Sequence, residues 1–258
     1  MSGVLERGFL VLECLAARPD GLALSTLASE LQIPLSATHR LLSEMVRLGY
    51  VRQNAAGTEY GLTIKLAAMG LSFLSNSGMV DIAQPLLDEL AAKAGDLVRL
   101  AVVDGEQLIF VAKAQGAKHG LLYDPDMGTS VALSCSAAGH AWLSTMDDDQ
   151  AIALLARQGL GKVSDYGPAA PTTIQSTMKF VAAAREQGFS MINDMFAPGM
   201  TAMGAPVFNA KGTAIGVITI AGPLVRLTDQ RMQELGPQLM SAALDLSRAS
   251  AASRFFKG

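Results

Sequence analysis

LASELQIPLSATHRLLSEMVRLGYV, the stretch from Leu27 to Val51, predicts two short helices separated by a sharp turn. Ser25 or Thr26 is the predicted N-cap of the first helix, because a hydroxyl ahead of an apolar run accepts a hydrogen bond from the first turn. Ile33-Pro34 ends this helix, since the residue before a proline disfavours helical backbone angles. The second helix is predicted from about Ser36 to Arg47, where apolar residues again recur at helical spacing.

The second helix has one apolar face and one polar face. Hydroxyl and guanidinium groups recur on the polar face at spacings of four, three and four residues. Such a stripe suits the base edges and phosphates of DNA, so the pair of helices favours a helix-turn-helix. The alternative is that any amphipathic helix leaves a polar face in solvent. The side chains predicted to contact DNA, one of them from the segment after the helix, are Ser36, Ala37, His39, Arg40, Ser43, Arg47 and Arg52.

The residues after the second helix predict a short β-hairpin. Leu48 to Arg52 and Tyr60 to Leu62 flank a turn from Asn54 to Gly57. A helix-turn-helix followed by a hairpin is a winged helix, and polar side chains at the wing tip can reach a neighbouring groove or phosphate. Arg52 and the two polar residues after it are expected near that tip. The alternative is a solvated hairpin that contacts nothing.

Composition excludes several classes of protein. Half of the 258 residues are hydrophobic, yet no uncharged apolar run approaches the roughly 20 residues that span a bilayer. Glu6, Arg7 and Glu13 interrupt the apolar N-terminus, which predicts an amphipathic helix rather than a secretory signal, so we expect a cytoplasmic protein with no membrane partner. Cys14 and Cys135 are too few and too far apart for a disulfide framework, and no metal or other cofactor is expected.

Charge bears on the prediction of DNA binding. Residues 1–78 carry six basic and six acidic side chains, whereas a nucleic-acid-binding domain is usually basic. Positive charge is concentrated between residues 35 and 65, where four basic side chains outnumber two acidic ones. Affinity for DNA comes largely from counterion release, so one copy with few phosphate contacts would bind weakly. We therefore expect two or more copies to act together, as a homodimer or homotetramer.

The rest of the chain predicts a linker helix and a mixed second domain. Leu66 to Leu74 has helical spacing and is either a linker helix with a dimer contact or a core helix of the first domain. One predicted hairpin joins Leu97–Val103 to Leu108–Ala112, and another joins Ala205–Phe208 to Ile215–Ala221. Hairpins mixed with helices favour an α+β domain with an antiparallel sheet. Helices are predicted at about 80–94, 136–146, 149–157, 173–187 and 228–252.

A run of small residues from Met127 to Gly139 precedes and opens one of these helices. Free N–H groups at a helix N-terminus favour an anion by roughly 0.3–1 kcal/mol when exposed and up to about 2 kcal/mol when partly buried. A small carboxylate is therefore a predicted ligand of this segment. The alternative is that Ser134 or Ser136 only caps the helix and that the small residues permit close packing.

Several short motifs follow one another in order along the chain. They are Ser36, His39-Arg40-Leu41-Leu42, Leu48-Gly49-Tyr50-Val51, Ser136-Ala137-Ala138-Gly139, Gly188-Phe189, Pro198-Gly199, Ala205-Pro206-Val207 and Ala221-Gly222-Pro223. With these motifs the chain resembles the IclR family of bacterial transcriptional regulators from about Val4 to Leu246. The resemblance implies a winged helix-turn-helix in residues 1–65, a linker helix in 66–78 and a GAF-like effector-binding domain in 79–258. It also implies a dimer or a dimer of dimers on a pseudo-palindromic DNA operator.

The resemblance further implies where an effector would bind. Family members tuned to small 2-oxo acids carry acidic, thiol or hydroxyl groups at several positions where this chain has Ile192, Ala202 and Ala221. The implied pocket is more apolar, so an aromatic or otherwise hydrophobic carboxylic acid is expected. Its carboxylate is expected near Ala137, Ala138 and Thr219, and its apolar body against Tyr123 and Ile192. The recognition helix also departs from the family, with Leu35, Ala37 and Thr38 where Lys, Thr and Val are common. The effector-binding residues implied by position are Leu121, Tyr123, Ala137, Ala138, Ile192, Ala202, Thr219 and Ala221.

Two other functions fit parts of the sequence. Cys135 with His140 or His119 would supply the nucleophile and base of an acyl-transfer enzyme. Against this, Cys135 falls just outside the helix that Ser136 would cap, and a lone cysteine is more often a small buried hydrophobe. The other alternative is a ligand-binding or interaction module whose winged helix contacts protein instead of DNA. We favour a ligand-responsive transcriptional regulator over both.

Overall fold

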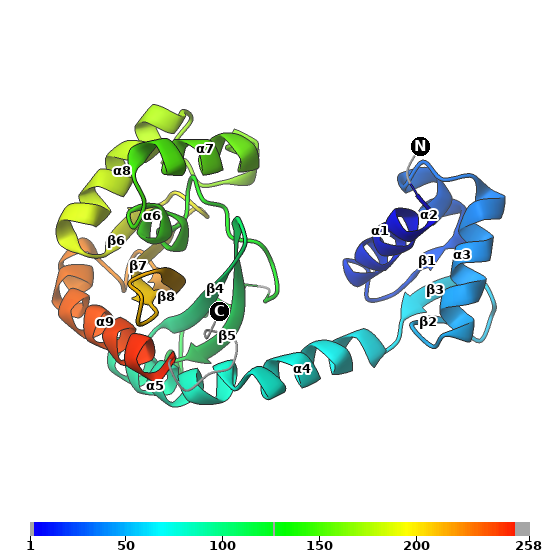
Figure 1. Ribbon diagram of the computed structural model, residues 1–258, viewed down its shortest axis with the longest axis horizontal. Coiled ribbons are helices and arrows are strands. Elements are labelled where there is room, and N and C mark those ends of the chain that lie inside the picture. The colour runs from blue at the N-terminus through cyan, green and yellow to red at the C-terminus, as the bar shows by residue number, and fades with distance from the viewer. Residues whose placement is uncertain (1–2, 126, 251–258) are drawn as a thin grey trace. The chain divides into compact units, whose positions relative to one another are not determined.

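The computed structural model describes residues 3–125 and 127–250 (Figure 1). Contacts divide the chain into two compact units, Met1–Asn76 and Ser77–Gly258. Each unit contains a hydrophobic core built from its own residues.

Helices surround a small antiparallel sheet in the first unit. Its elements are α1 (Val4–Ala16), β1 (Leu22–Ala23), α2 (Leu24–Glu30), α3 (Leu35–Arg47), β2 (Val51–Gln53), β3 (Glu59–Leu62) and α4 (Lys65–Ser77). The strands pair in the order β1-β3-β2. Val11 of α1, Leu27 of α2 and Leu42 of α3 are fully buried in one cluster with Tyr60 of β3 nearby. This is the predicted winged helix-turn-helix, in which burial of the apolar helix faces leaves the polar face of α3 outside.

Helix α2 begins earlier than the sequence predicts. Its N-cap is Ala23, which supplies no side-chain cap, and the hydroxyl-bearing Ser25 and Thr26 lie inside the first turn. The predicted N-cap is wrong because β1 pairs with β3 as far as Ala23, so the helix starts where the strand ends. Gln32, at φ 54°, then lies in the turn before α3, and α3 starts at Leu35, close to its predicted start.

Helices cover both faces of a five-stranded antiparallel sheet in the second unit (Figure 1). The strand order is β5-β4-β8-β7-β6, which confirms the predicted α+β fold class. The elements are α5 (Met79–Ala94), β4 (Leu97–Asp104), β5 (Gln107–Gln115), α6 (Ala137–Leu143), α7 (Asp148–Gln158), a 3₁₀ turn (Val163–Asp165), α8 (Ile174–Gln187), β6 (Ser190–Asn193), β7 (Met200–Phe208), β8 (Ala214–Pro223) and α9 (Asp229–Ser250).

Alternation of side chains along the strands separates two apolar layers. On one face of the sheet, Leu100 of β4 and Ile218 of β8 pack in a cluster with Leu235 of α9. On the other face, Val217 of β8 belongs to a cluster with Leu143 of α6 and with residues of α7 and α8. Full burial of such an aliphatic side chain stabilises the folded state by roughly 1.5–3 kcal/mol. Both faces of the sheet are therefore covered.

The sequence pattern predicts fewer and shorter strands than the structure contains. Strands β1 and β6 are not predicted, and β7 begins at Met200 although the prediction starts at Ala205. Residues 200–204 lack the β-branched and aromatic density that marks a strand, so pairing with β6 and β8 imposes the extended conformation. Helix α6 ends at Leu143, earlier than predicted, and positions 251 and 252 of the predicted last helix lie outside the described residues.

No single helix in the described part of the chain is long and apolar enough to cross a membrane. Helix α4 and residues Val80–Ala94 of α5 satisfy length and composition only when taken together across an 87° bend.

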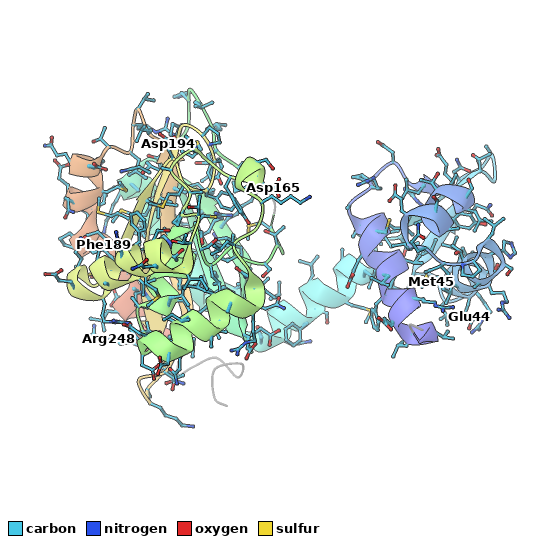
Figure 2. All side chains as sticks on the ribbon, turned by 90° about the horizontal axis from the view of Figure 1, so that it is seen from above. Glu44, Met45, Asp165, Phe189, Asp194 and Arg248 are labelled. Atoms are coloured by element: carbon cyan, nitrogen blue, oxygen red, sulfur yellow. The ribbon has the colours of Figure 1, made fainter. Side chains whose placement is uncertain are left out.

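Two glycines let helices approach neighbouring segments closely. In α9, a Cβ added at Gly236 would lie 2.7 Å from the ring of Phe189 (labelled in Figure 2). In α6, a Cβ added at Gly139 would lie 2.5 Å from the Cα and the carbonyl oxygen of Leu133. The second contact is with backbone, which cannot move aside as a flexible side chain can. Close packing of α6 on the segment before it therefore requires glycine at position 139.

We expect Gly139→Ala to lower the free energy of unfolding of the second unit by about 1–3 kcal/mol, the usual range for overpacking. Gly70→Ala in α4 is the matched control, because no atom lies within 4 Å of a Cβ added there. That change should be neutral or stabilising by up to about 1 kcal/mol, since alanine is the better helix former. Denaturant unfolding followed by circular dichroism measures both, and a Gly139→Ala protein as stable as its parent would contradict the close packing.

Candidate functional site

Helix α3 presents a polar face to solvent. Thr38 and Leu42 are buried on its opposite side, and Ala37 is half-buried and packs toward the same core. Arg40 makes no hydrogen bond or ion pair with any residue that the structure describes, and with Leu35 it borders a shallow surface hollow. The predicted DNA-contacting residues of α3 that are exposed are Ser36, His39, Arg40, Ser43 and Arg47.

Arg47 differs from Arg40 in having a partner. Its guanidinium donates from Nε and Nη2 to the two carboxylate oxygens of Glu44, and the Nε–Oε2 distance is 2.9 Å (Glu44 is labelled in Figure 2). The hydrogen bond from Arg47 lowers the pKa of Glu44. Both side chains are exposed, and such surface pairs contribute little to stability. Exchange of Glu44 for a phosphate would therefore cost Arg47 little.

The wing carries Arg52, which like Arg40 is a predicted DNA contact without a partner in the described chain. Arg52 is exposed on β2, opposite Gly61 of β3, and no described residue pairs with its charge. The loop beyond it is held by Asn54, whose Oδ1 accepts from the backbone N–H of Thr58 at 2.9 Å. Lys65, by contrast, donates from Nζ to the Leu48 carbonyl at 2.7 Å at the end of α3. Of the four basic residues between positions 35 and 65, only Arg40 and Arg52 are without a protein partner in the described chain.

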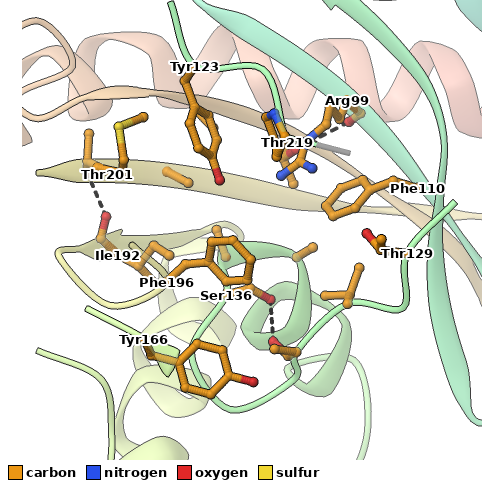
Figure 3. A pocket seen from close by; sticks show the side chains of 18 of the residues that line it. Arg99, Phe110, Tyr123, Thr129, Ser136, Tyr166, Ile192, Phe196, Thr201 and Thr219 are labelled. Atoms are coloured by element: carbon orange, nitrogen blue, oxygen red, sulfur yellow. Dashed lines mark hydrogen bonds between the residues drawn. The ribbon is translucent and has the colours of Figure 1, made fainter. Parts of the chain in front are cut away.

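A cavity of about 390 Å³ lies on the face of the second sheet that carries α6 (Figure 3). Its floor consists of two cross-strand rows, in which Arg99 lies opposite Thr219, and Ala221 lies opposite Ala202, which lies opposite Ile192. Residues two apart on a strand share a face, so strand register alone places these five side chains together. A cavity of this size accommodates a small organic molecule.

The N-terminal end of α6 forms one wall of the cavity. Gly204 of β7 permits the approach, since a Cβ there would lie 3.0 Å from the Ala137 carbonyl, and Ser190 Oγ donates to the same carbonyl at 2.6 Å. Ser136 caps the helix and accepts from the Gly139 N–H at 3.0 Å. The helix is only seven residues long and its cap is occupied, so the geometry favours capping and close packing over an anion site at this helix end.

The loop between β5 and α6 forms a second wall. Tyr123 points into the cavity from this loop (Figure 3), whereas Leu121, two residues earlier, is 63% exposed and does not line it. Three polar contacts hold the loop, because Gln115 donates to the Tyr123 carbonyl at 3.1 Å, Lys113 binds Asp124 at 2.5 Å, and Arg226 donates to the Leu121 carbonyl at 3.3 Å. The predicted effector residues that line the cavity are Tyr123, Ala137, Ala138, Ile192, Ala202, Thr219 and Ala221.

Sequence reasoning missed the most polar group of the cavity, Arg99. It is 7% exposed, its guanidinium carbon lies 3.6 Å from the centre of the Phe110 ring, and its Nε is buried with no hydrogen-bond partner. Burial lowers the pKa of Arg99, but an arginine keeps its charge throughout the physiological range. A charged residue inside the apolar run Leu97–Val103 was the available signal, because a lone cation in a buried strand is costly unless something balances it.

The structure does not form the cysteine–histidine pair of the enzyme hypothesis. His140 is fully buried, its Nε2 lies 2.8 Å from the Ser134 carbonyl, and its ring stacks on Phe180. Burial raises the pKa of the Cys135 thiol to about 11, so the thiolate is scarce at neutral pH. His119 is an exposed residue of the loop before α6. Within residues 3–125 and 127–250, no three His, Cys, Asp or Glu side chains are grouped to hold a metal ion.

Two domain families match the sequence. The domain described as "Bacterial transcriptional regulator IclR C-terminal" matches residues 71–248, and the IclR helix-turn-helix domain matches residues 4–55. The chain is 29% identical to the transcriptional repressor IclR of Escherichia coli over 247 residues, which cover 95% of this chain and 89% of that protein. It is likewise 29% identical to the acetate operon repressor of Salmonella typhimurium over 252 residues, with 97% and 90% covered.

Solved structures show the same fold at lower sequence identity. An IclR-type regulator from Alicyclobacillus acidocaldarius superposes with a TM-score of 0.82 at 20% identity, covering 97% of this chain and 99% of the other. An IclR homologue from Microbacterium hydrocarbonoxydans, crystallised with 4-hydroxybenzoate, gives a TM-score of 0.79 at 18% identity, covering 97% and 100%. The likeness extends over both units of the chain.

His140 should make the stability of the second unit depend on pH. Burial lowers its pKa to about 4, and its Nδ1 has no acceptor for a second proton. Because this pKa lies below the ordinary value near 6.5, the unfolded chain takes up the proton first as pH falls. The free energy of unfolding is therefore unaffected by this group above about pH 6.5, and falls by about 3 kcal/mol between there and about pH 4.

The measurement is denaturant unfolding of the second unit at a series of pH values. His140→Phe should remove this component of the pH dependence, whereas His119→Gln should retain it because His119 is exposed. An unchanged pH profile in His140→Phe would show that other groups cause the loss of stability.

Proposed function

The chain belongs to the IclR family of bacterial transcriptional regulators, and we propose that a small hydrophobic or aromatic carboxylic acid controls its binding to a pseudo-palindromic operator. The chain is thus a DNA-binding transcriptional regulator and not an enzyme. We infer the effector, the operator and the assembly from the cavity and from the predicted DNA-binding surface.

One observation supports effector control above others. Seven of the eight residues expected to bind an effector surround a single cavity of about 390 Å³ in the second unit. The walls are largely apolar, with Ile192, Ala202 and Ala221 contributing no polar side-chain atom, while Arg99 adds one buried positive charge. A ligand that fills this space needs an apolar body and one anionic group. An aromatic carboxylic acid has both, as does the 4-hydroxybenzoate bound by the Microbacterium homologue.

The low charge of the predicted DNA-binding surface supports the proposal of an oligomer. Arg40 and Arg52 are the basic residues of the predicted interface that lack a protein partner in the described chain, and two cations release few counterions from DNA. Two linked copies raise the effective concentration of the second contact, so paired recognition helices would bind a site of matching symmetry. Half-sites would then be separated by about 10.5 base pairs or a multiple of it.

Effector binding would act on DNA affinity only through linkage. A ligand shifts the equilibrium between DNA-binding arrangements by its difference in affinity for them, and DNA shifts ligand affinity by the same factor. The proposal therefore requires that the effector bind the DNA-free and DNA-bound protein with different affinities.

Calorimetric titration of the full chain tests the effector class. Benzoate, 4-hydroxybenzoate and phenylacetate represent the proposed acids, and pyruvate and glyoxylate represent small polar oxo acids. We expect the aromatic acids to bind and to change the affinity for a retained genomic DNA fragment. Binding confined to the oxo acids would overturn the proposed effector, while leaving the family assignment intact.

Arg40→Ala should remove preference for one base pair of the operator. Arg40 is exposed and unpaired on the polar face of α3, and a bidentate contact to guanine discriminates by about 1–3 kcal/mol. Arg52→Ala is the matched comparison on the wing, and should weaken binding to all sequences and lower the salt slope by about 1. Fluorescence anisotropy on operator, single-base variants and random DNA at several salt concentrations measures both. Equal losses on operator and random DNA for Arg40→Ala would refute its role in base reading.

A further inference from the structure

We propose that Arg99 on β4 and Tyr123 on the β5–α6 loop together bind the carboxylate of the effector, so that the ligand supplies the missing counter-ion of a buried arginine. This inference rests on the proposed function, because it concerns the same cavity. Arg99 and Tyr123 would recognise the charge of the effector, which would be a monoanion with an apolar body.

Arg99 is a buried cation that forms no ion pair with a described residue. Its Nε has no hydrogen-bond partner, and its side chain forms no ion pair with any residue in the described part of the chain. Asp124, the described carboxylate that acts on Arg99, binds Lys113 at 2.5 Å, and Asp96, just before β4, binds Arg226 with an Nε–Oδ1 distance of 2.9 Å. Buried charges are normally paired, so an unpaired one that opens into a cavity indicates a ligand of opposite charge.

The surroundings of Arg99 fix the plane of its guanidinium. One face lies over the Phe110 ring at 3.6 Å, an arrangement in which the ring quadrupole attracts the cation without accepting its N–H groups. Strand pairing places Arg99 opposite Thr219 on the cavity floor (Figure 3). A planar guanidinium held in this way leaves its polar edge toward the cavity, where it matches the two oxygens of a carboxylate.

Tyr123 supplies a second donor at the same end of the cavity. Its ring enters from the loop, and its hydroxyl and the Arg99 guanidinium both point into the cavity (Figure 3). Burial raises the pKa of Tyr123, and the charge of Arg99 lowers it. The hydroxyl forms no hydrogen bond with a described residue. It can therefore donate to a carboxylate oxygen that Arg99 also binds.

The remaining walls determine the rest of the ligand. Ala202, Ala221 and Ile192 offer no polar side-chain atom, and Ser136 already donates to the Ala132 carbonyl at 2.6 Å while capping α6. A second carboxylate would lose its hydration without gaining a cation, because Arg99 is the one basic residue among those that line the cavity in the described chain. The cavity should therefore discriminate against dianions and against neutral isosteres of the same shape.

A carboxylate held by both residues would connect the sheet to the loop. Arg99 lies on β4, whereas the loop that carries Tyr123 is attached to the body of the unit through the side chains of Gln115, Lys113 and Arg226. Ligand binding would add a contact at Tyr123 itself and reduce the opening of the loop. Slower hydrogen exchange of the peptide that contains Tyr123 is the expected sign of this connection.

The experiment is calorimetric titration of the full chain with three acids and their neutral amides, namely benzoate and benzamide, 4-hydroxybenzoate and 4-hydroxybenzamide, and phenylacetate and phenylacetamide. Terephthalate serves as the dianion. We expect the parent to bind at least one acid more than 10-fold tighter than its amide and than terephthalate. Arg99→Met should weaken that acid about 100-fold and abolish the preference over the amide, and Tyr123→Phe should weaken it about 10-fold.

Two further variants separate a binding role from a structural one. Arg99→Lys keeps the charge but not the planar donor edge, and should retain a preference for acid over amide with reduced affinity. Arg157→Met is the control, since Arg157 is an exposed partner of Glu106 elsewhere in the same unit, and should bind as the parent does. The melting temperature of ligand-free Arg99→Met should equal or exceed that of the parent, because an unpaired buried charge has been removed.

The outcomes distinguish this inference from the proposed function. If Arg99→Met binds the acid as tightly as the parent, the role of Arg99 is wrong and acid control stands. If the parent binds no acid of the panel, or binds amides equally well, both the carboxylate reading and the proposed effector class are overturned. Normal acid binding without protection of the Tyr123 peptide, together with unchanged affinity in Tyr123→Phe, would remove Tyr123 alone.

Discussion

Antiparallel pairing of β4 with β8 is the constraint on which the second unit depends. Arg99 lies opposite Thr219, while the neighbouring pair Leu100 and Ile218 packs in the apolar layer with α9. Because the side-chain period of a strand is two, a slip of one residue would move Arg99 into that layer and turn Leu100 into the cavity. Burial of the apolar residues on one face of the sheet therefore determines which side chains face the cavity on the other.

The sequence predicts elements better than it predicts their contacts. Apolar spacing is enough to place α3, because burial of Thr38 and Leu42 leaves the polar side outside. The start of α2 depends instead on where β1 stops pairing with β3, which no residue near Ser25 encodes. Strand β6 is similarly absent from the sequence pattern, since four residues with few strand formers become extended only through their pairing with β7.

In the candidate site too, the sequence identifies some residues, whereas others emerge only from their contacts. Motif order identifies the cavity, and seven of its residues follow from position in the family. Arg99 does not, because its importance lies in what it lacks, namely a partner, and only the assembled structure shows that Asp96 and Asp124 are paired elsewhere. The helix N-terminus suggested an anion site for a correct chemical reason, but Ser136 already occupies the cap and α6 is short.

The low charge of the predicted DNA-binding surface would make DNA affinity sensitive to an effector. With Arg40 and Arg52 as the unpaired cations of each predicted interface in the described chain, one copy gains little from counterion release, and in the proposed oligomer affinity would depend on two copies reaching their half-sites together. Affinity that comes from paired binding falls as soon as the spacing of the pair departs from that of the operator. A strongly basic surface would bind DNA in either arrangement and would mask the effect of a ligand. A weakly charged surface therefore suits a regulator in which a small acid, bound in another unit of the chain, decides whether the pair fits.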